Sequence, residues 1–251
     1  MNRRYVPAFI VAALGWMAPG AATAGEPCAL MAADSAGVVS VRDARTALLN
    51  DGRELRLAGI EVAGQGPDAL RALVDGQTLR LHRAPGADRY GRLVAYATLP
   101  GAVQTVQETL VAQGQALVSA RIGDKACAEA LFAAERGARA ARRGVWADPN
   151  SAPLSSENLP GLEAAAGHFS LIEGRILSVR ESGAVIYMNF GRRWTRDFTV
   201  TVLKRQQRLF TDAGVDLKQL EGRRIRVRGW IERRGGPIVE AAAPEQIELI
   251  D

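Results

Sequence analysis

Hydrophobic and polar residues alternate over several short stretches in the first half of the chain. A period of two residues is typical of strands with one buried face. The predicted strands cover residues 38–42, 46–49, 54–60, 77–82 and 93–99. The turn sequence Asn50-Asp51-Gly52 predicts a hairpin between the second and third strands. Helical periodicity appears over residues 67–74, 103–113 and 126–143.

The second half of the chain shows a similar succession after an interruption. Residues 148–167 are rich in Pro, Ser, Asn, Gly and Ala without periodicity, which predicts a linker. The following elements are predicted as strands over residues 170–180, 184–190 and 196–204, a helix over 206–213, a strand over 223–233, and short strands near Ile238 and Ile247. Three strands, a helix and two more strands follow the order of an OB-fold, a small barrel that often binds oligonucleotides. We therefore predict two units, 25–147 and 168–251, both mainly β with helices, an α+β class.

The N-terminal segment has the pattern of an export signal. Arg3 and Arg4 precede an apolar run over residues 5–18, and Ala22-Thr23-Ala24 forms a small-residue cleavage site. The sequence predicts a signal peptide over residues 1–24, cleaved after Ala24, and a periplasmic or secreted protein without a membrane span. A retained anchor is the alternative.

The chain contains two cysteines, Cys28 and Cys127. An even number of cysteines in an exported protein predicts a disulfide, and two buried free thiols are the alternative. The two histidines, His82 and His168, do not lie at ligand spacing with either cysteine, so no metal site of this type is expected.

Positive charge is in moderate excess in the C-terminal part of the chain. The formal net charge is +5, and residues 168–251 carry 15 Lys and Arg against 11 Asp and Glu. Such an excess favours long-range attraction of an anionic polymer to the C-terminal unit. A surplus of this size is also common in ordinary soluble domains.

Several short motifs of the first unit resemble the thermonuclease (staphylococcal nuclease-like) family in order and spacing over residues 37–147. They are Asp43-Ala44-Arg45-Thr46, Asn50-Asp51-Gly52, residues 56–60, residues 88–92, and Glu135 with Trp146. The resemblance implies a five-stranded OB-type barrel with flanking helices and calcium-dependent cleavage of DNA and RNA. The C-terminal unit, through residues 189–191 and 244–248, is similar to an OB-like domain of some bacterial secreted relatives.

The resemblance also implies a set of site residues, and this chain departs from it. The two phosphate-clamping arginines of the family fall on Arg56 and Arg92, and both are present. Where the family reads D-G-D-T, Arg45 replaces a calcium-binding Asp. Where it reads D-A-P-E or D-T-P-E, Glu61 replaces a metal-binding Asp and Gly64 replaces the Glu associated with the attacking water. We therefore expect no metal and no cofactor, with Ca²⁺ relevant only if the chain is a nuclease.

The arginines of this site have two interpretations. Arg45 pairs with Glu61 or binds a phosphate directly, and Arg56 and Arg92 bind phosphate or form structural ion pairs with groups such as Asp88. An anion pocket of Arg45, Arg56 and Arg92 and a set of ordinary ion pairs both stay open at this point.

A basic strand in the C-terminal unit offers a second candidate surface. Strand parity places one row of side chains on the same face, namely Arg224, Arg226, Arg228 and Trp230. A row of guanidiniums ending in an indole suits a phosphate backbone with a stacked base. Residues 187–194 add aromatic and basic groups near a loop. The alternative is a solvated strand with core aromatics.

Together these features predict an exported protein that binds nucleic acid or another polyanion with little or no hydrolysis. One alternative is an active phosphodiesterase with a rearranged acid set, in which Glu61 holds a metal and Arg56 and Arg92 stabilise the transition state. The other is a non-catalytic envelope scaffold in which neither barrel binds nucleic acid.

Overall fold

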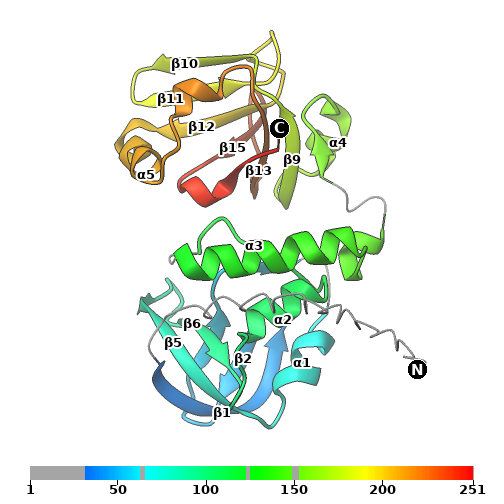
Figure 1. Cartoon of the computed structure of the whole chain (residues 1–251), viewed down its shortest axis with the longest axis vertical. Helices are drawn as coiled ribbons and strands as arrows, with labels where there is room; N and C mark the ends of the chain where they lie inside the picture. The colour runs from blue at the N-terminus through cyan, green and yellow to red at the C-terminus, as the bar shows by residue number, and fades with distance from the viewer. Residues whose placement is uncertain (1–31, 63–65, 123–124, 149–152, 251) are drawn as a thin grey trace, which may run out of the picture.

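The computed structural model describes residues 32–62, 66–122, 125–148 and 153–250, apart from the side chains of residues 32 and 83–86. These residues form two units with one long helix, α3 (Lys125–Ala140), lying between them (Figure 1). The predicted signal peptide and Cys28 lie outside the described residues, so export and the Cys28–Cys127 disulfide stay predictions. Cys127 itself is fully buried in α3.

The first unit is built on a closed five-stranded barrel of order β1-β2-β3-β6-β5. Its strands are β1 (Ala32–Asp43), β2 (Thr46–Leu49), β3 (Glu54–Leu57), β5 (Thr78–Ala87) and β6 (Leu93–Thr98). The β3–β6 pair is parallel and the other pairs are antiparallel. The predicted α+β class and the N-terminal five-stranded barrel are confirmed.

Helices and a small second sheet close the barrel core. They are α1 (Asp68–Val74), α2 (Val106–Ala112), α3, the 3-10 helix η1 (Gly144–Ala147), and the antiparallel pair of β4 (Ile60–Val62) with β7 (Ala116–Val118). A capping box starts α2: the Thr105 hydroxyl accepts the Glu108 N–H at 3.1 Å, and the Glu108 carboxylate accepts the Thr105 N–H at 3.1 Å. Leu110 of α2 and Leu131 of α3 are buried in the same core as the barrel leucines.

Gly59 permits a tight connection between β3 and β4. Its φ is +74°, and a Cβ at this position would collide with the hydroxyl of Tyr96. That hydroxyl is fixed because it donates a hydrogen bond to the Ile122 carbonyl at 2.9 Å. Only glycine meets both requirements without strain.

We expect Gly59→Ala to lower the free energy of unfolding by about 2–4 kcal/mol, because backbone strain and overpacking add. Urea unfolding measures this loss. Gly76→Ala is the matched control, since Gly76 has a φ of +67° and open space around the added methyl. Equal losses in the two variants would show that the collision with Tyr96 contributes nothing.

The second unit consists of two sheets, ordered β10-β11-β12-β15-β14 and β16-β13-β9-β8. The strands are β8 (Leu154–Ser155), β9 (Phe169–Arg175), β10 (Ser178–Ser182), β11 (Val185–Asn189), β12 (Thr199–Leu203), β13 (Arg224–Trp230), β14 (Glu232–Arg234), β15 (Gly236–Glu240) and β16 (Ile247–Leu249). The sheets are connected where β9 leads into β10 and where β13 leads into β14. The parallel β12–β15 pair repeats the parallel pair of the first barrel. A second closed barrel stays a prediction.

Short helices complete this unit, and part of the predicted linker belongs to it. They are α4 (Leu159–Ala164), η3 (Lys204–Gln206), α5 (Gln207–Asp212), η4 (Leu217–Leu220) and η5 (Pro244–Gln246). The structure differs from the linker predicted over residues 148–167, because β8 pairs with β9 and Leu162 of α4 is fully buried in the second core. Asn158 starts α4 by accepting the Gly161 N–H at 3.1 Å. The stretch is too short to show a helical period.

One face of α3 packs into the barrel and another faces the second unit (Figure 1). Ala138 of α3 and Trp146 of η1 form a buried apolar cluster with Leu171 of β9. Among the helices that the structure describes, none combines the length and the apolar character needed to cross a membrane.

Candidate anion-binding site

The barrel brings Arg45, Arg56 and Arg92 to one place. Arg45 lies in the turn between β1 and β2, Arg56 on β3, and Arg92 directly before β6. Arg56 is in register with Thr46 of β2 and Val94 of β6, so it lies between the strands that adjoin the other two arginines.

Arg45 is held by Glu61 and by the backbone. Its Nη1 lies 2.5 Å from the Glu61 Oε2 and donates to the Ile60 carbonyl at 2.8 Å. The turn that carries it is fixed by Asp43, whose carboxylate accepts the Arg45 backbone N–H at 2.8 Å. Of the two interpretations of Arg45, the structure shows the ion pair with Glu61.

Arg92 is held in a similar way by Asp88. Its Nε and Nη2 both lie 2.7 Å from the Asp88 Oδ2. Burial alone would raise the pKa of Asp88, but the hydrogen bonds that Arg92 and Tyr90 donate to this carboxylate outweigh it and lower the pKa. The ionised Asp88 carboxylate therefore stabilises the fold above its unfolded-state pKa. This contribution is lost as the pH falls through the lowered pKa of the folded state.

Tyr90 lies at the edge of this site and was not singled out from the sequence. The guanidinium carbons of Arg89 and Arg92 lie 4.7 and 4.9 Å from the centroid of its ring. Tyr90 is 65% exposed. The signal for it was the turn Asp88-Arg89-Tyr90-Gly91-Arg92, where an aromatic residue stands between two arginines.

Arg56 differs from its two neighbours. Burial lowers its pKa, and the positive charges of Arg45 and Arg92 lower it further, while Glu61 and Asp43 act in the opposite direction. Within the part of the chain that the structure describes, its side chain donates no hydrogen bond and forms no ion pair. A half-buried guanidinium with unused donors beside two other guanidiniums favours an anion.

The carboxylates near these arginines do not fit Ca²⁺. Calcium takes six to eight oxygen ligands, whereas Asp43 and Glu61 are the acids that act on Arg56, and Glu61 is bound by Arg45. Gly64 lies outside the described residues. No cluster of three or more potential metal-ligating side chains occurs in the ranges described. The Arg45 guanidinium lies against the Glu61 carboxylate, where its charge would repel a metal cation.

The prediction that the whole arginine row of β13 faces nucleic acid is wrong, because the Arg228 side chain is fully buried against α3. Its Nη2 lies 3.0 Å from the Glu135 Oε2, its Nη1 donates to the Val118 carbonyl at 3.0 Å, and it also pairs with Glu248. Its guanidinium carbon lies 4.5 Å from the centroid of the Phe132 ring. The face chosen by strand parity is the face that packs on the first unit.

The other residues of the row differ in how far their side chains are buried. Arg226 is 15% exposed and pairs with Glu173 at 2.6 Å and Glu248 at 3.2 Å. Arg224, whose side chain is 55% exposed, lies 3.7 Å from the same Glu173. Trp230 is 51% exposed and packs edge-on against Phe169. The row therefore forms part of an inter-unit network instead of one continuous nucleic-acid surface.

The less exposed part of that network combines three arginines with three glutamates from both units: Glu135, Arg139, Glu173, Arg226, Arg228 and Glu248. The more exposed Arg224 adjoins it at Glu173. Burial lowers the pKa of Arg139, and the nearby charge of Arg226 adds to this effect. The sequence pattern does not reveal this network, because its partners come from elements far apart in the chain.

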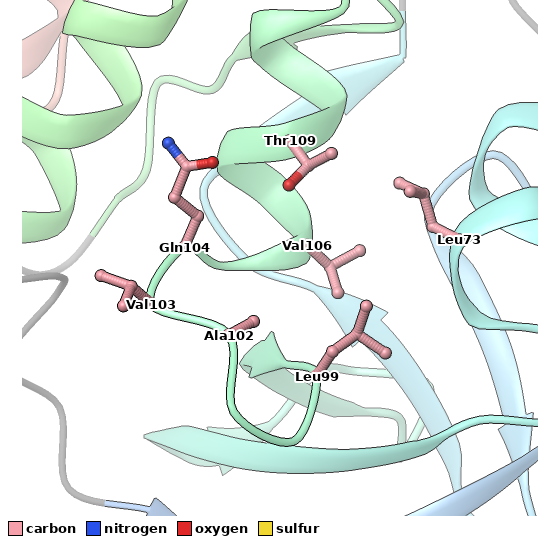
Figure 2. Close-up of a pocket in the computed structure, with 7 residues that line it drawn as sticks. All are labelled: Leu73, Leu99, Ala102, Val103, Gln104, Val106 and Thr109. Atoms are coloured by element: carbon pink, nitrogen blue, oxygen red, sulfur yellow. The ribbon is translucent and has the colours of Figure 1, made fainter.

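An apolar pocket of about 270 Å³ lies elsewhere in the first unit, between α1 and the segment leading into α2 (Figure 2). Leu73, Leu99 and Val106 point into it from three different segments. Its lining contains no charged side chain, so it does not suit a phosphate.

Comparison with known proteins is consistent with the barrel. Residues 62–148 match the family model described as Staphylococcal nuclease homologue. The matched range includes Arg92 and Glu135, whereas Arg45, Arg56 and Glu61 lie before its first residue. No curated protein matches the chain. The chain therefore contains a domain of the staphylococcal nuclease (thermonuclease) family.

Proposed function

We propose that this protein binds nucleic acid or another polyanion at Arg45, Arg56 and Arg92, with little or no hydrolysis. The single observation that carries the proposal is Arg56, a partly buried guanidinium without an ion pair to any described residue, between two further arginines. The family to which the first unit belongs supports nucleic acid as the ligand class. The sequence of residues 1–24 supports export, which is part of the same proposal.

A phosphate group is a suitable partner for Arg56. A guanidinium can donate two parallel hydrogen bonds to phosphate oxygens, and such charge-assisted bonds are stronger than neutral ones. Glu61 and Asp88 hold Arg45 and Arg92 in fixed positions. These two ion pairs restrain the side chains of Arg45 and Arg92. Binding of an anion at Arg56 therefore costs little further conformational entropy in these two side chains.

Weak or absent hydrolysis follows from the acids, since in-line attack on a phosphodiester needs an oriented nucleophile and neutralised charge. The arginines can neutralise the charge of the phosphate. The two nearby carboxylates are already engaged and do not orient a water: Glu61 is bound by Arg45, and Asp43 accepts a backbone hydrogen bond. The described site therefore holds a phosphate more readily than it activates a water.

We expect Arg56→Met to weaken binding of a fluorescent single-stranded oligonucleotide about 10-fold at low salt, because one charge-assisted contact is lost while the apolar stem is retained. Fluorescence anisotropy over a salt series measures both affinity and the number of phosphate contacts. Arg53→Met is the matched control, since Arg53 lies on the same hairpin but pairs with Asp34 at 2.7 Å and Asp51 at 2.5 Å.

The alternatives give different results in the same preparations. Calcium-dependent cleavage that disappears in Arg92→Ala would establish an active nuclease and contradict the proposal. Failure of the unaltered protein to bind any nucleic acid at low salt would favour the scaffold. Equal affinities of Arg56→Met and Arg53→Met would remove Arg56 from the binding site.

A further inference from the structure

The loop between β11 and β12 presents a dense group of exposed cationic and aromatic side chains. Arg192, Arg193, Trp194 and Arg196 are all exposed. Trp194, at 73%, has the largest exposed fraction among the exposed large hydrophobic residues of the described chain. The three arginines form no ion pair with any residue that the structure describes. Exposure of an indole among unpaired cations has no evident stabilising role in the fold.

The loop is held in one conformation. Asp197 accepts the Arg193 backbone N–H at 2.8 Å, and the Arg193 carbonyl accepts the N–H of Arg196 at 2.8 Å and of Asp197 at 2.7 Å. A Cβ at Gly191 would collide with the Asp197 carboxylate, and a Cβ at Gly236 would lie 2.6 Å from the Arg196 carbonyl. The loop thus packs closely on the start of β15. Trp194 is presented by a preorganised backbone, which reduces the entropy lost on binding.

A groove of about 220 Å³ extends from this loop over the five-stranded sheet. Trp194, Tyr187 and Thr201 are among the residues that line it. Tyr187 of β11 is in register with Thr201 of β12, and Asn189 with Thr199, so these side chains share one face of the sheet. The hydroxyl of Thr199 donates to the side-chain amide oxygen of Asn189, Oδ1, at 3.4 Å. The groove combines two aromatic rings with uncharged hydrogen-bonding groups.

Acidic groups near the groove are already engaged. Asp197 lines it, but its carboxylate accepts the backbone hydrogen bond that shapes the loop. Glu240 also lines it and lies 4.0 Å from Arg234, which in turn pairs with Glu232 at 2.8 Å. The arginines at positions 192, 193 and 196 therefore carry the unpaired charge of this region.

We propose that this loop and groove bind single-stranded nucleic acid, with the loop arginines on phosphates and with Trp194 and Tyr187 against bases. Stacking on aromatic side chains together with a basic track is the general solution for binding single strands. In a duplex the bases are paired and stacked on one another, so they cannot reach Trp194. The proposal goes beyond the function proposed above, because it adds a second site on the other unit and selects single strands over duplexes.

The test uses the full chain and a fluorescent oligothymidine, with a duplex of the same length as the competitor. We expect Trp194→Ala to weaken binding of the single strand about 10-fold and Trp194→Phe to restore part of the loss, because a smaller ring still stacks. Binding of the single strand should quench tryptophan fluorescence, and the quenching should fall in both variants. The double variant Arg192→Ala with Arg193→Ala should reduce the slope of log affinity against log salt.

Arg208→Ala is the matched control for the arginines, since Arg208 is an exposed arginine of α5 that pairs with Asp212 within its own helix. Unchanged affinity of Trp194→Ala for the single strand would overturn the proposal. So would tighter binding of the duplex, or equally tight and equally Trp194-dependent binding of a sulfated polysaccharide, which has no bases. Loss of affinity in Arg56→Met with none in Trp194→Ala would overturn this site alone and leave the proposed function in place.

Discussion

Replacing Arg228 by Met is expected to lower the free energy of unfolding by about 3–5 kcal/mol, a large fraction of the stability of an ordinary protein. The substitution keeps an apolar chain in contact with Phe132 but leaves the carboxylate of Glu135 without its cation. Glu135 is 1% exposed, so water cannot replace the lost partner. Urea unfolding monitored by circular dichroism measures the change.

Arg224→Met is the matched control because it removes an arginine from the same strand and the same face, where the side chain is 55% exposed. A loss below about 1 kcal/mol is expected there, as for surface ion pairs in general. Adding Glu135→Gln to Arg228→Met should recover part of the loss, since the amide oxygen can still accept the Val118 N–H that Glu135 now accepts at 2.8 Å. A similar small loss in both single variants would mean that the buried charge of Glu135 is not what makes Arg228 important.

The pH dependence of the same variants provides an independent readout. Burial works to raise the pKa of Glu248, but the charge and hydrogen bond of Arg228, with Arg226 and Arg139, lower it overall. A lowered pKa in the folded state means that the ionised group stabilises the fold above its unfolded-state pKa. This contribution is lost as the pH falls through the folded-state pKa. Arg228→Met should therefore make stability fall less between neutral and acidic pH.

Replacing Arg45 by Asp is expected to have the largest effect on ligand binding. It exchanges a cation for a carboxylate between Asp43 and Glu61, so a site suited to an anion becomes one suited to a cation. Unit charges about 4 Å apart interact by roughly 4 kcal/mol at an effective dielectric of about 20. We therefore expect oligonucleotide affinity at this site to fall, and Ca²⁺ affinity to rise, each by more than about 100-fold. Isothermal titration calorimetry with Ca²⁺ and anisotropy with the oligonucleotide measure both.

Arg45→Met distinguishes the two causes. It removes the cation that pairs with Glu61 but adds no oxygen ligand, so it should weaken oligonucleotide binding without a comparable gain in Ca²⁺ affinity. Equal Ca²⁺ affinities in Arg45→Asp and Arg45→Met would refute the view that the Arg45 position decides between a metal and a phosphate. Hydrolysis is not expected in Arg45→Asp, because position 64 still lacks a carboxylate. The double variant Arg45→Asp with Gly64→Glu tests whether a carboxylate at position 64 is needed for hydrolysis.

Local patterns were sufficient to predict most of the first unit. Alternation placed the strand over residues 46–49 at the bounds that the structure has, and the Asn50-Asp51-Gly52 turn indicated the β2–β3 hairpin. The joint position of Arg45 and Arg56 was implied by the resemblance to the thermonuclease family, and the short β2–β3 hairpin is consistent with it. These features depend on neighbours in sequence, where propensity and turn chemistry act directly.

Features that depend on distant partners could not be predicted in the same way. Strand parity correctly grouped Arg224, Arg226 and Arg228 on one face, but it cannot show whether that face meets water or another unit. The partner of Arg228 is Glu135, 93 residues earlier in the chain. A buried arginine and an exposed one have the same sequence pattern, and only the docking of α3 on the second sheet distinguishes them.

The position of α3 has a consequence for how this chain can change over evolutionary time. Glu135 and Arg228 belong to different units, and each contributes to neutralising the buried charge of the other. A substitution of either residue removes the opposite charge from the other, which stays buried. Each position therefore limits the substitutions that are tolerated at the other. A replacement of either unit by another would therefore have to supply a matching charge at this position.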